Sequence, residues 1–156
     1  MRDSVGRTRG KVVPALIAVI MASAGGASAA EPQSPEDVHT ALRILASVYA
    51  DMQSKLPSQL DRLPHENGEF HEGSGAMRDA MAHEPPAFRS KVLAALDKAV
   101  NDSQRVADAS QGHDVAQVQA ALQQLANSMR ELNALFPAQL RAEPGSMPPP
   151  HHAASP

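Results

Sequence analysis

Two histidines and two methionines gather in the middle of the chain, within the segment FHEGSGAMRDAMAHEPPAF at residues 70–88. Imidazole and thioether groups are ligands that copper favours, and the thioether prefers Cu(I). Met77 and Met81 are four positions apart, so in a helix they would share one face and could reach one ion. We therefore treat His71, Met77, Met81 and His83 as a candidate metal site, with copper as the metal.

The same four residues also have a structural interpretation. His83 follows Met81 by two positions, so a regular helix would turn it to another side, and it would reach the ion only if the helix frayed before Pro85. The spacing matches no established metal motif such as His-x-x-x-His. Methionine commonly fills hydrophobic cores. In that interpretation the two methionines close a core and the two histidines are solvated.

The chain begins with the pattern of a cleaved secretory signal. Basic residues up to Lys11 precede an apolar stretch from Val12 to Ala24, and small residues with an Ala-x-Ala pattern follow at Ala27 and Ala29. The apolar stretch is short for a membrane span. We therefore expect residues 1–30 to be removed, and the protein to reach the periplasm with no membrane segment left.

Composition excludes several classes of function. The chain has no cysteine, so disulfides, thiolate metal sites and covalent haem attachment are excluded. It carries 14 Lys and Arg and 17 Asp and Glu, of which four bases and one acid lie in residues 1–30, so the remainder carries 10 and 16 and a net charge of −6. An acidic chain with no basic stripe argues against nucleic acid and anionic membranes as partners.

Three segments carry the apolar periodicity of amphipathic helices. The first begins at Ser34 or Pro35 and ends by Pro57, and the second runs from the Pro85–Pro86 pair to Gly112. The third begins at His113 or Asp114, and Pro137 should end it. Its inner positions recur at alternating spacings of three and four: Val115, Val118, Leu122, Leu125, Met129, Leu132 and Phe136.

The segment between the first two long helices is weaker. Pro64 is expected to interrupt it, residues 65–75 contain three glycines and are expected to form a loop, and residues 75–83 are expected to form a short helix. We therefore expect an all-α, up-and-down antiparallel four-helix bundle over residues 31–140, with a short or broken second helix. Residues 141–156 are rich in Pro and Ala and are expected to be a disordered tail.

Several landmarks occur in an order that resembles the cytochrome c prime family and the related soluble periplasmic cytochrome b bundles. They are Phe70 with EGS at 72–74, the Pro-x-Phe helix start at Pro86 and Phe88, the Gly-x-Asp turn at 112–114 and the final aromatic Phe136. The resemblance covers about residues 35–141. It implies an exported four-helix bundle with one haem near the end of the last helix, and a homodimer formed through the first helices.

The haem site of that family does not carry over to this chain. If Phe136 matches the family aromatic, the two cysteines of the Cys-x-x-Cys-His motif fall on Met129 and Leu132, and the axial histidine falls on Asn133. The methionine ligand of the non-covalent cytochromes falls near Leu42. Non-covalent haem would then need Met52 or Met129 as a ligand, and both lie on apolar stripes where methionine is usually filler.

Catalysis finds no support in the sequence, since no serine or carboxylate lies in a recognisable nucleophile or acid–base arrangement. Glu66 and Glu69 fall in the expected loop, without a cleft to desolvate them. The leading hypothesis is an exported, non-enzymatic bundle that binds a protein partner or a small ligand and holds no cofactor. The alternatives are a copper-binding protein that uses the His/Met set and an electron-transfer protein with non-covalent haem.

Overall fold

The computed structural model describes residues 31–143, so the expected signal segment and residues 144–156 lie outside the described part. Four α-helices and two short 3₁₀ helices make up this part of the chain. In order they are α1 (Pro35–Ser54), η1 (Leu60–Arg62), α2 (Leu63–Ala80), α3 (Pro86–Gln111), α4 (Val115–Ala134) and η2 (Ala138–Leu140).

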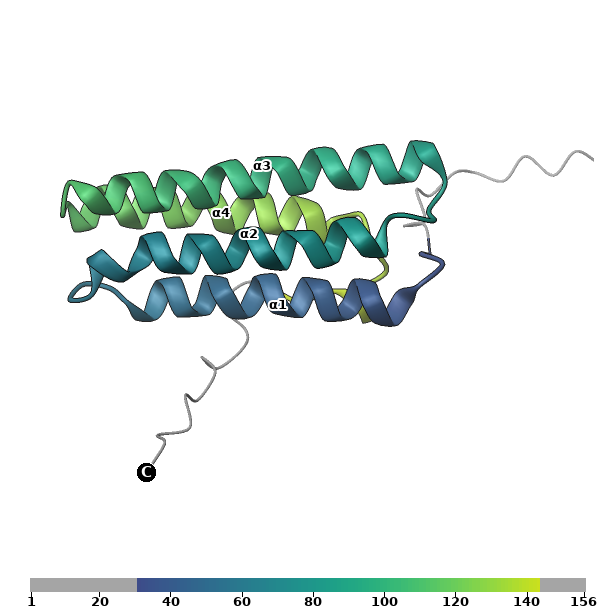
Figure 1. The fold of residues 1–156 in the computed structure, drawn as a ribbon, viewed down its shortest axis with the longest axis horizontal. Coiled ribbons are helices and arrows are strands. Elements are labelled where there is room, and N and C mark those ends of the chain that lie inside the picture. Colours follow the sequence, from purple (N-terminus) through teal and green to yellow (C-terminus); the bar gives the residue numbers. More distant parts are fainter. Residues whose placement is uncertain (1–30, 144–156) are drawn as a thin grey trace, which may run out of the picture.

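The four α-helices run up and down in sequence order and pack side by side (Figure 1). Short connections join each helix to the next, which makes neighbours antiparallel. No strand occurs among residues 31–143, and no helix in that range has the length and apolarity needed to span a bilayer. The prediction of an all-α, antiparallel four-helix bundle is confirmed.

The interior is filled by the apolar stripes of the three long predicted helices. Val38, Leu45 and Met52 of α1 are completely buried, as are Leu96 of α3 and Leu125 of α4. The Phe88 and Phe136 rings meet edge to face, with 5.8 Å between centroids, where α3 begins and α4 has just ended. Each large side chain fully buried in this way contributes about 1.5–3 kcal/mol to stability.

The ends of the long helices follow their predicted signals. Pro35 and Pro86 occupy the first turns of α1 and α3, where a missing N–H costs nothing. Asp114 caps α4, and its Oδ1 accepts hydrogen bonds from the amides of Ala116 and Gln117 at 2.9 and 3.3 Å. Before this cap, His113 takes a positive φ of 53° and lets the chain reverse from α3 to α4.

The expectation of a short or broken second helix is wrong. Helix α2 is continuous over 18 residues and ends at Ala80, so residues 65–75 are helical and the following turn starts at Met81. Pro64 lies in the first helical turn, where proline is tolerated, and so it does not interrupt the helix. A Cβ atom added at Gly68 or Gly75 would meet no other atom within 4 Å, so no packing contact requires glycine at these two positions.

Helix α2 packs against its neighbours partly through a glycine and polar side chains, which do not belong to an apolar stripe. A Cβ atom on Gly73 would lie 2.8 Å from Cγ2 of Ile44, so the missing side chain lets α1 and α2 approach closely. On the side toward α3, Asn67 Oδ1 accepts the Ser103 hydroxyl proton at 2.7 Å, and its Nδ2 donates to Gln104 at 2.9 Å. Polar side chains therefore complete the buried face of this helix.

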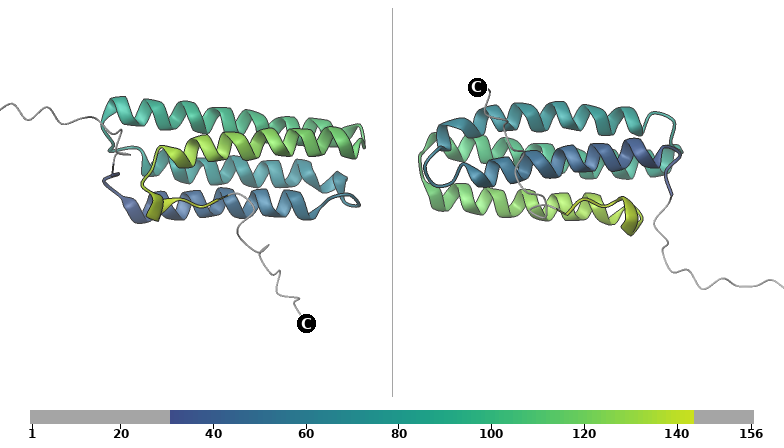
Figure 2. Two further views of the ribbon diagram at one scale, coloured as in Figure 1. Left: turned by 180° about the vertical axis from the view of Figure 1, so that it is seen from behind. Right: turned by 90° about the horizontal axis from the view of Figure 1, so that it is seen from below.

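The chain after α4 folds back over the bundle. Figure 2 shows this C-terminal segment (yellow) passing from the end of α4 to the beginning of α1. Leu140 and Ala142 are buried there, and the Arg141 Nε donates to the Phe136 carbonyl at 2.9 Å. Arg141–Glu143, which the sequence assigned to a disordered tail, thus belong to the described bundle.

The close approach at Gly73 predicts opposite effects for two alanine substitutions in one helix. Gly73→Ala should lower the free energy of unfolding by about 1–3 kcal/mol, because Cγ2 of the branched Ile44 side chain cannot move aside freely. Gly75→Ala should raise it by about 0.5–1 kcal/mol, because only helix propensity changes. Urea denaturation followed by circular dichroism measures both.

Ile44→Ala provides the matching control for the clash. Combined with Gly73→Ala, it should recover much of the lost stability, since it removes the atom that the new methyl group meets. Equal effects of Gly73→Ala and Gly75→Ala would contradict the proposed contact.

Candidate functional site

The structure separates the four residues of the His/Met set. Met77 and Met81 are completely buried in the core, near the end of α2, whereas His71 and His83 are exposed. His71 lies six residues before Met77, about 9 Å along the helix axis and on another side of it. His83 lies in the turn after α2. In this arrangement the methionines serve as core residues and the imidazoles face solvent.

Asn133, at the position that matches the axial histidine of cytochrome c prime, binds the C-terminal segment through hydrogen bonds. Asn133 is 2% exposed. Its Nδ2 donates to the carbonyls of Met129 and Ala142, both at 3.0 Å, and its Oδ1 accepts the Ala142 N–H at 2.9 Å. The side-chain amide thus pairs with the backbone of Ala142 in both directions. We call this contact the Asn133 clamp.

Two further hydrogen bonds fix the residues just before α1 and just after α4 at this end of the bundle. His39, half-buried in the first turns of α1, places its Nδ1 3.0 Å from the Leu140 carbonyl, so this nitrogen donates the hydrogen bond. Glu84, buried in the α2–α3 connection, accepts the backbone N–H of Gln33. The residues before α1 and after α4 are therefore both fixed by hydrogen bonds at the end of the bundle where cytochrome c prime proteins hold haem.

The residues at this end do not fit a haem group. Met129 and Leu132 are 2% and 1% exposed, so both positions that match the family cysteines are filled by core side chains. The amide of Asn133 is fully used by backbone partners. Leu42 and Met52 are likewise buried within the packed core. Buried residues of the chain therefore occupy the positions that match the family's haem attachment and ligand residues.

A group of acidic residues lies at the opposite end, where α1 ends and α2 begins. Oxygen atoms of Asp51, Glu66 and Glu69 lie within 4.8 Å of one another, and the first two residues are buried. Three carboxylates this close repel each other unless a cation is near. Lys55 supplies one, with its Nζ 3.2 Å from Glu66 Oε1. His65 lies 3.3 Å from Glu69.

This acidic group has a structural explanation. Lys55 and Glu66 side chains are only 16% and 7% exposed, so their ion pair connects α1 to α2 in a largely desolvated position. Carboxylates are also the ligands that hard divalent cations prefer. Because the largely buried Lys55–Glu66 ion pair already connects α1 to α2, we assign this group a role in joining the two helices.

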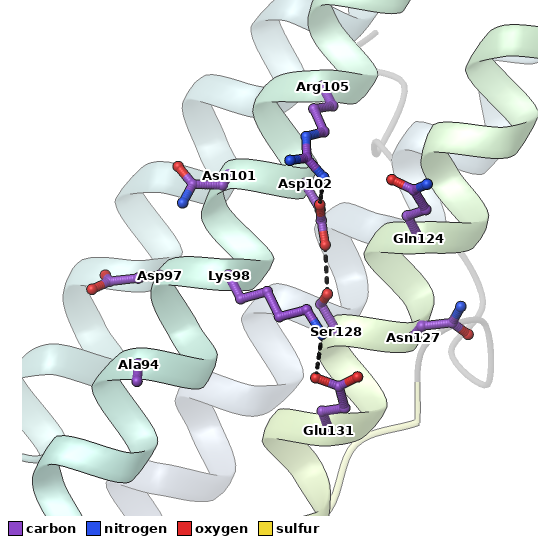
Figure 3. A pocket seen from close by; sticks show the side chains of 10 residues that line it. All are labelled: Ala94, Asp97, Lys98, Asn101, Asp102, Arg105, Gln124, Asn127, Ser128 and Glu131. Atoms are coloured by element: carbon purple, nitrogen blue, oxygen red, sulfur yellow. Dashed lines mark hydrogen bonds and ion pairs between the residues drawn. The ribbon is translucent and has the colours of Figure 1, made fainter.

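A polar groove of about 590 Å³ runs between α3 and α4 (Figure 3). Its floor is a buried pair, in which the Ser128 hydroxyl donates to Asp102 Oδ2 and Arg105 donates to Oδ1 at 2.8 Å. Lys98 and Glu131 form an ion pair across it. The remaining lining residues are Ala94, Asp97, Asn101, Gln124 and Asn127.

The groove combines fixed and adaptable groups. Asp102 and Ser128 are 4% and 1% exposed and hold each other in place. In contrast, the side chains of Lys98, Arg105 and Glu131 are 53%, 65% and 57% exposed. The Lys98–Glu131 pair is exposed on both sides and is therefore weak, so these two charges can turn toward a ligand at little cost. The groove therefore offers both signs of charge and several amides above a rigid floor.

Sequence reasoning singled out Asn133 only as a missing haem ligand, and it missed the groove altogether. The available signal was the presence of polar residues on otherwise apolar stripes. Asp102 and Ser103 interrupt the inner face of α3, and Ser128 and Asn133 interrupt that of α4. A polar residue at a buried position requires a partner. Which partner it finds depends on how the helices are rotated against each other.

Comparison with known proteins identifies no relative: no protein-family model, no curated protein and no solved structure matches this chain.

The Asn133 clamp predicts a large effect for a small substitution. Asn133→Ala should lower the free energy of unfolding by about 2–3 kcal/mol, because it leaves the buried polar backbone groups of Ala142 without partners. It should also speed hydrogen exchange at the Ala142 amide. Asn127→Ala, at an exposed position of the same helix, is the matched control and should stay within about 0.5 kcal/mol. Equal effects of the two substitutions would contradict the clamp.

The four-residue copper site stays a prediction. The separation of the buried methionines from the exposed histidines does not favour it. We expect Met77→Leu combined with Met81→Leu to leave the affinity for Cu(I) unchanged, because both sulfur atoms are enclosed by the core. Competition against a chromophoric Cu(I) chelator measures this affinity. A tenfold or larger loss would show that the segment rearranges to bring His71, Met77, Met81 and His83 around one ion.

Proposed function

We propose that this chain is an exported, non-enzymatic binding protein that resembles cytochrome c prime in scaffold and works without haem. The observation that carries the proposal is the Asn133 clamp, which joins a filled core to the folded-back C-terminal segment. A bundle whose interior is closed in this way must bind its ligand at the surface. The signal-like residues 1–30 support export, and this part of the proposal rests on the sequence.

The α3–α4 groove is the surface that we assign to the ligand. Its charges come in both signs from facing helices, with Lys98 and Arg105 on α3 and Glu131 on α4. A ligand with one positive and one negative group can replace the exposed Lys98–Glu131 pair by two new ion pairs. We therefore propose a small peptide-like zwitterion as the ligand class.

The groove chemistry favours binding over catalysis. Ser128 donates its hydroxyl proton to Asp102, and as a residue it is only 1% exposed in the floor of the groove. No histidine lines the groove to act as a base for this serine. The charged groups on the rim form ion pairs with one another, which suits recognition of a charged ligand.

Amide chemical shifts test this proposal directly. Titrated with the dipeptide lysyl-glutamate, isotope-labelled protein should show saturable shifts at residues 97–105 and 124–131. Lys98→Ala combined with Glu131→Ala should weaken binding by about tenfold, since two ion pairs with the ligand are lost. The fold should persist, because the exposed pair contributes little to stability.

A second exposed pair provides the control. His65→Ala combined with Glu69→Ala removes an exposed side-chain contact near the beginning of α2 and should leave binding unchanged. N-acetyl-seryl-glutaminamide, which carries no charge at its termini or side chains, should bind less tightly than lysyl-glutamate. Equal binding of both dipeptides, or shifts confined to other helices, would contradict the assignment of the groove.

A further inference from the structure

The chain contains one tyrosine and no tryptophan, and that tyrosine lines a pocket separate from the α3–α4 groove. Tyr49, on α1, is 4% exposed. The pocket holds about 340 Å³ between the second half of α1 and the first half of α4. Its other lining residues are Gln53, Leu56, Gln119, Leu122 and Gln123.

The pocket lies on the part of the α1–α4 face that residues 138–143 do not contact. That segment contacts His39 near the start of α1 and Asn133 near the end of α4. Tyr49 and Gln119 lie toward the other ends of these helices.

Every polar group in the pocket is uncharged. Gln53 donates its Nε2 proton to the Tyr49 hydroxyl at 3.1 Å, so its carbonyl remains able to accept. Among residues 31–143, this is the hydrogen bond that the Tyr49 hydroxyl makes, and in it the hydroxyl accepts. The hydroxyl proton is therefore available to an acceptor on a ligand. Gln119 and Gln123 each add an amide that both donates and accepts.

The Tyr49 hydroxyl stays protonated over the ordinary pH range. Burial raises its pKa above the usual value, and the positive charge of Arg130 opposes this effect only in part. The hydroxyl therefore acts as a neutral donor. Leu56 and Leu122 provide the apolar part of the pocket wall.

We propose that this pocket binds a small uncharged carboxamide with an apolar side group. A carboxamide offers an acceptor for the Tyr49 proton and a donor for the free Gln53 carbonyl, while the leucines accommodate the apolar group. A charged ligand would lose its hydration without gaining an ion pair from any lining residue. The proposal is independent of the α3–α4 groove, which lies on the other side of α4.

The single tyrosine makes the test specific to this pocket. Tyrosine emission of the full chain should change saturably with N-acetyl-leucinamide, with a dissociation constant of about 1 mM for so small a ligand. Gln119→Leu should weaken binding about three- to tenfold, because it removes an exposed pocket amide without touching the core. Gln124→Leu, at a nearby exposed position that faces the α3–α4 groove, should leave it unchanged.

Calorimetry extends the test to the tyrosine itself. Tyr49→Phe keeps the ring but removes the donor, and should weaken binding by about three- to tenfold. An unchanged emission over the titration would overturn the proposal. So would equal affinities for the Gln119→Leu and Gln124→Leu variants, because the lost amide would then have no part in binding.

Discussion

The interior of this four-helix bundle is filled by its own side chains, and the rest of the structure depends on that packing. Voids between helices are costly because their lining loses contacts on one side. At the end of the bundle where α4 terminates, Met129 and Leu132 fill the core and Asn133 fastens the returning chain. The C-terminal segment thereby becomes part of the core.

Polar residues determine how the helices fit together. Each buried side-chain nitrogen or oxygen among residues 31–143 has a hydrogen-bond partner. Asn67 meets Ser103 between α2 and α3, and Asp102 meets Ser128 between α3 and α4. Leaving either group of a pair alone would cost the full desolvation penalty, so such contacts disfavour other rotations of the helices. Apolar stripes alone would permit several rotations.

Sequence periodicity predicted three helices and the bundle, because their stripes consist of large apolar residues. It failed for α2, whose buried face includes Asn67 and Gly73, residues that resemble loop signals without a neighbouring helix in view. The candidate site was harder to predict. Met77 and Met81 share a face as expected, but that face is the core, and the α3–α4 groove arises from a helix pairing that no local motif encodes.

The surface and the interior of this protein thus differ: the closed core gives stability, and we propose that the polar hollows between the helices bind ligands. We also propose that the core holds no cofactor. The absorption spectrum and metal content of the protein purified from its native host test this directly. We predict no Soret band and no stoichiometric metal. A Soret band, or one equivalent of copper, would contradict the account.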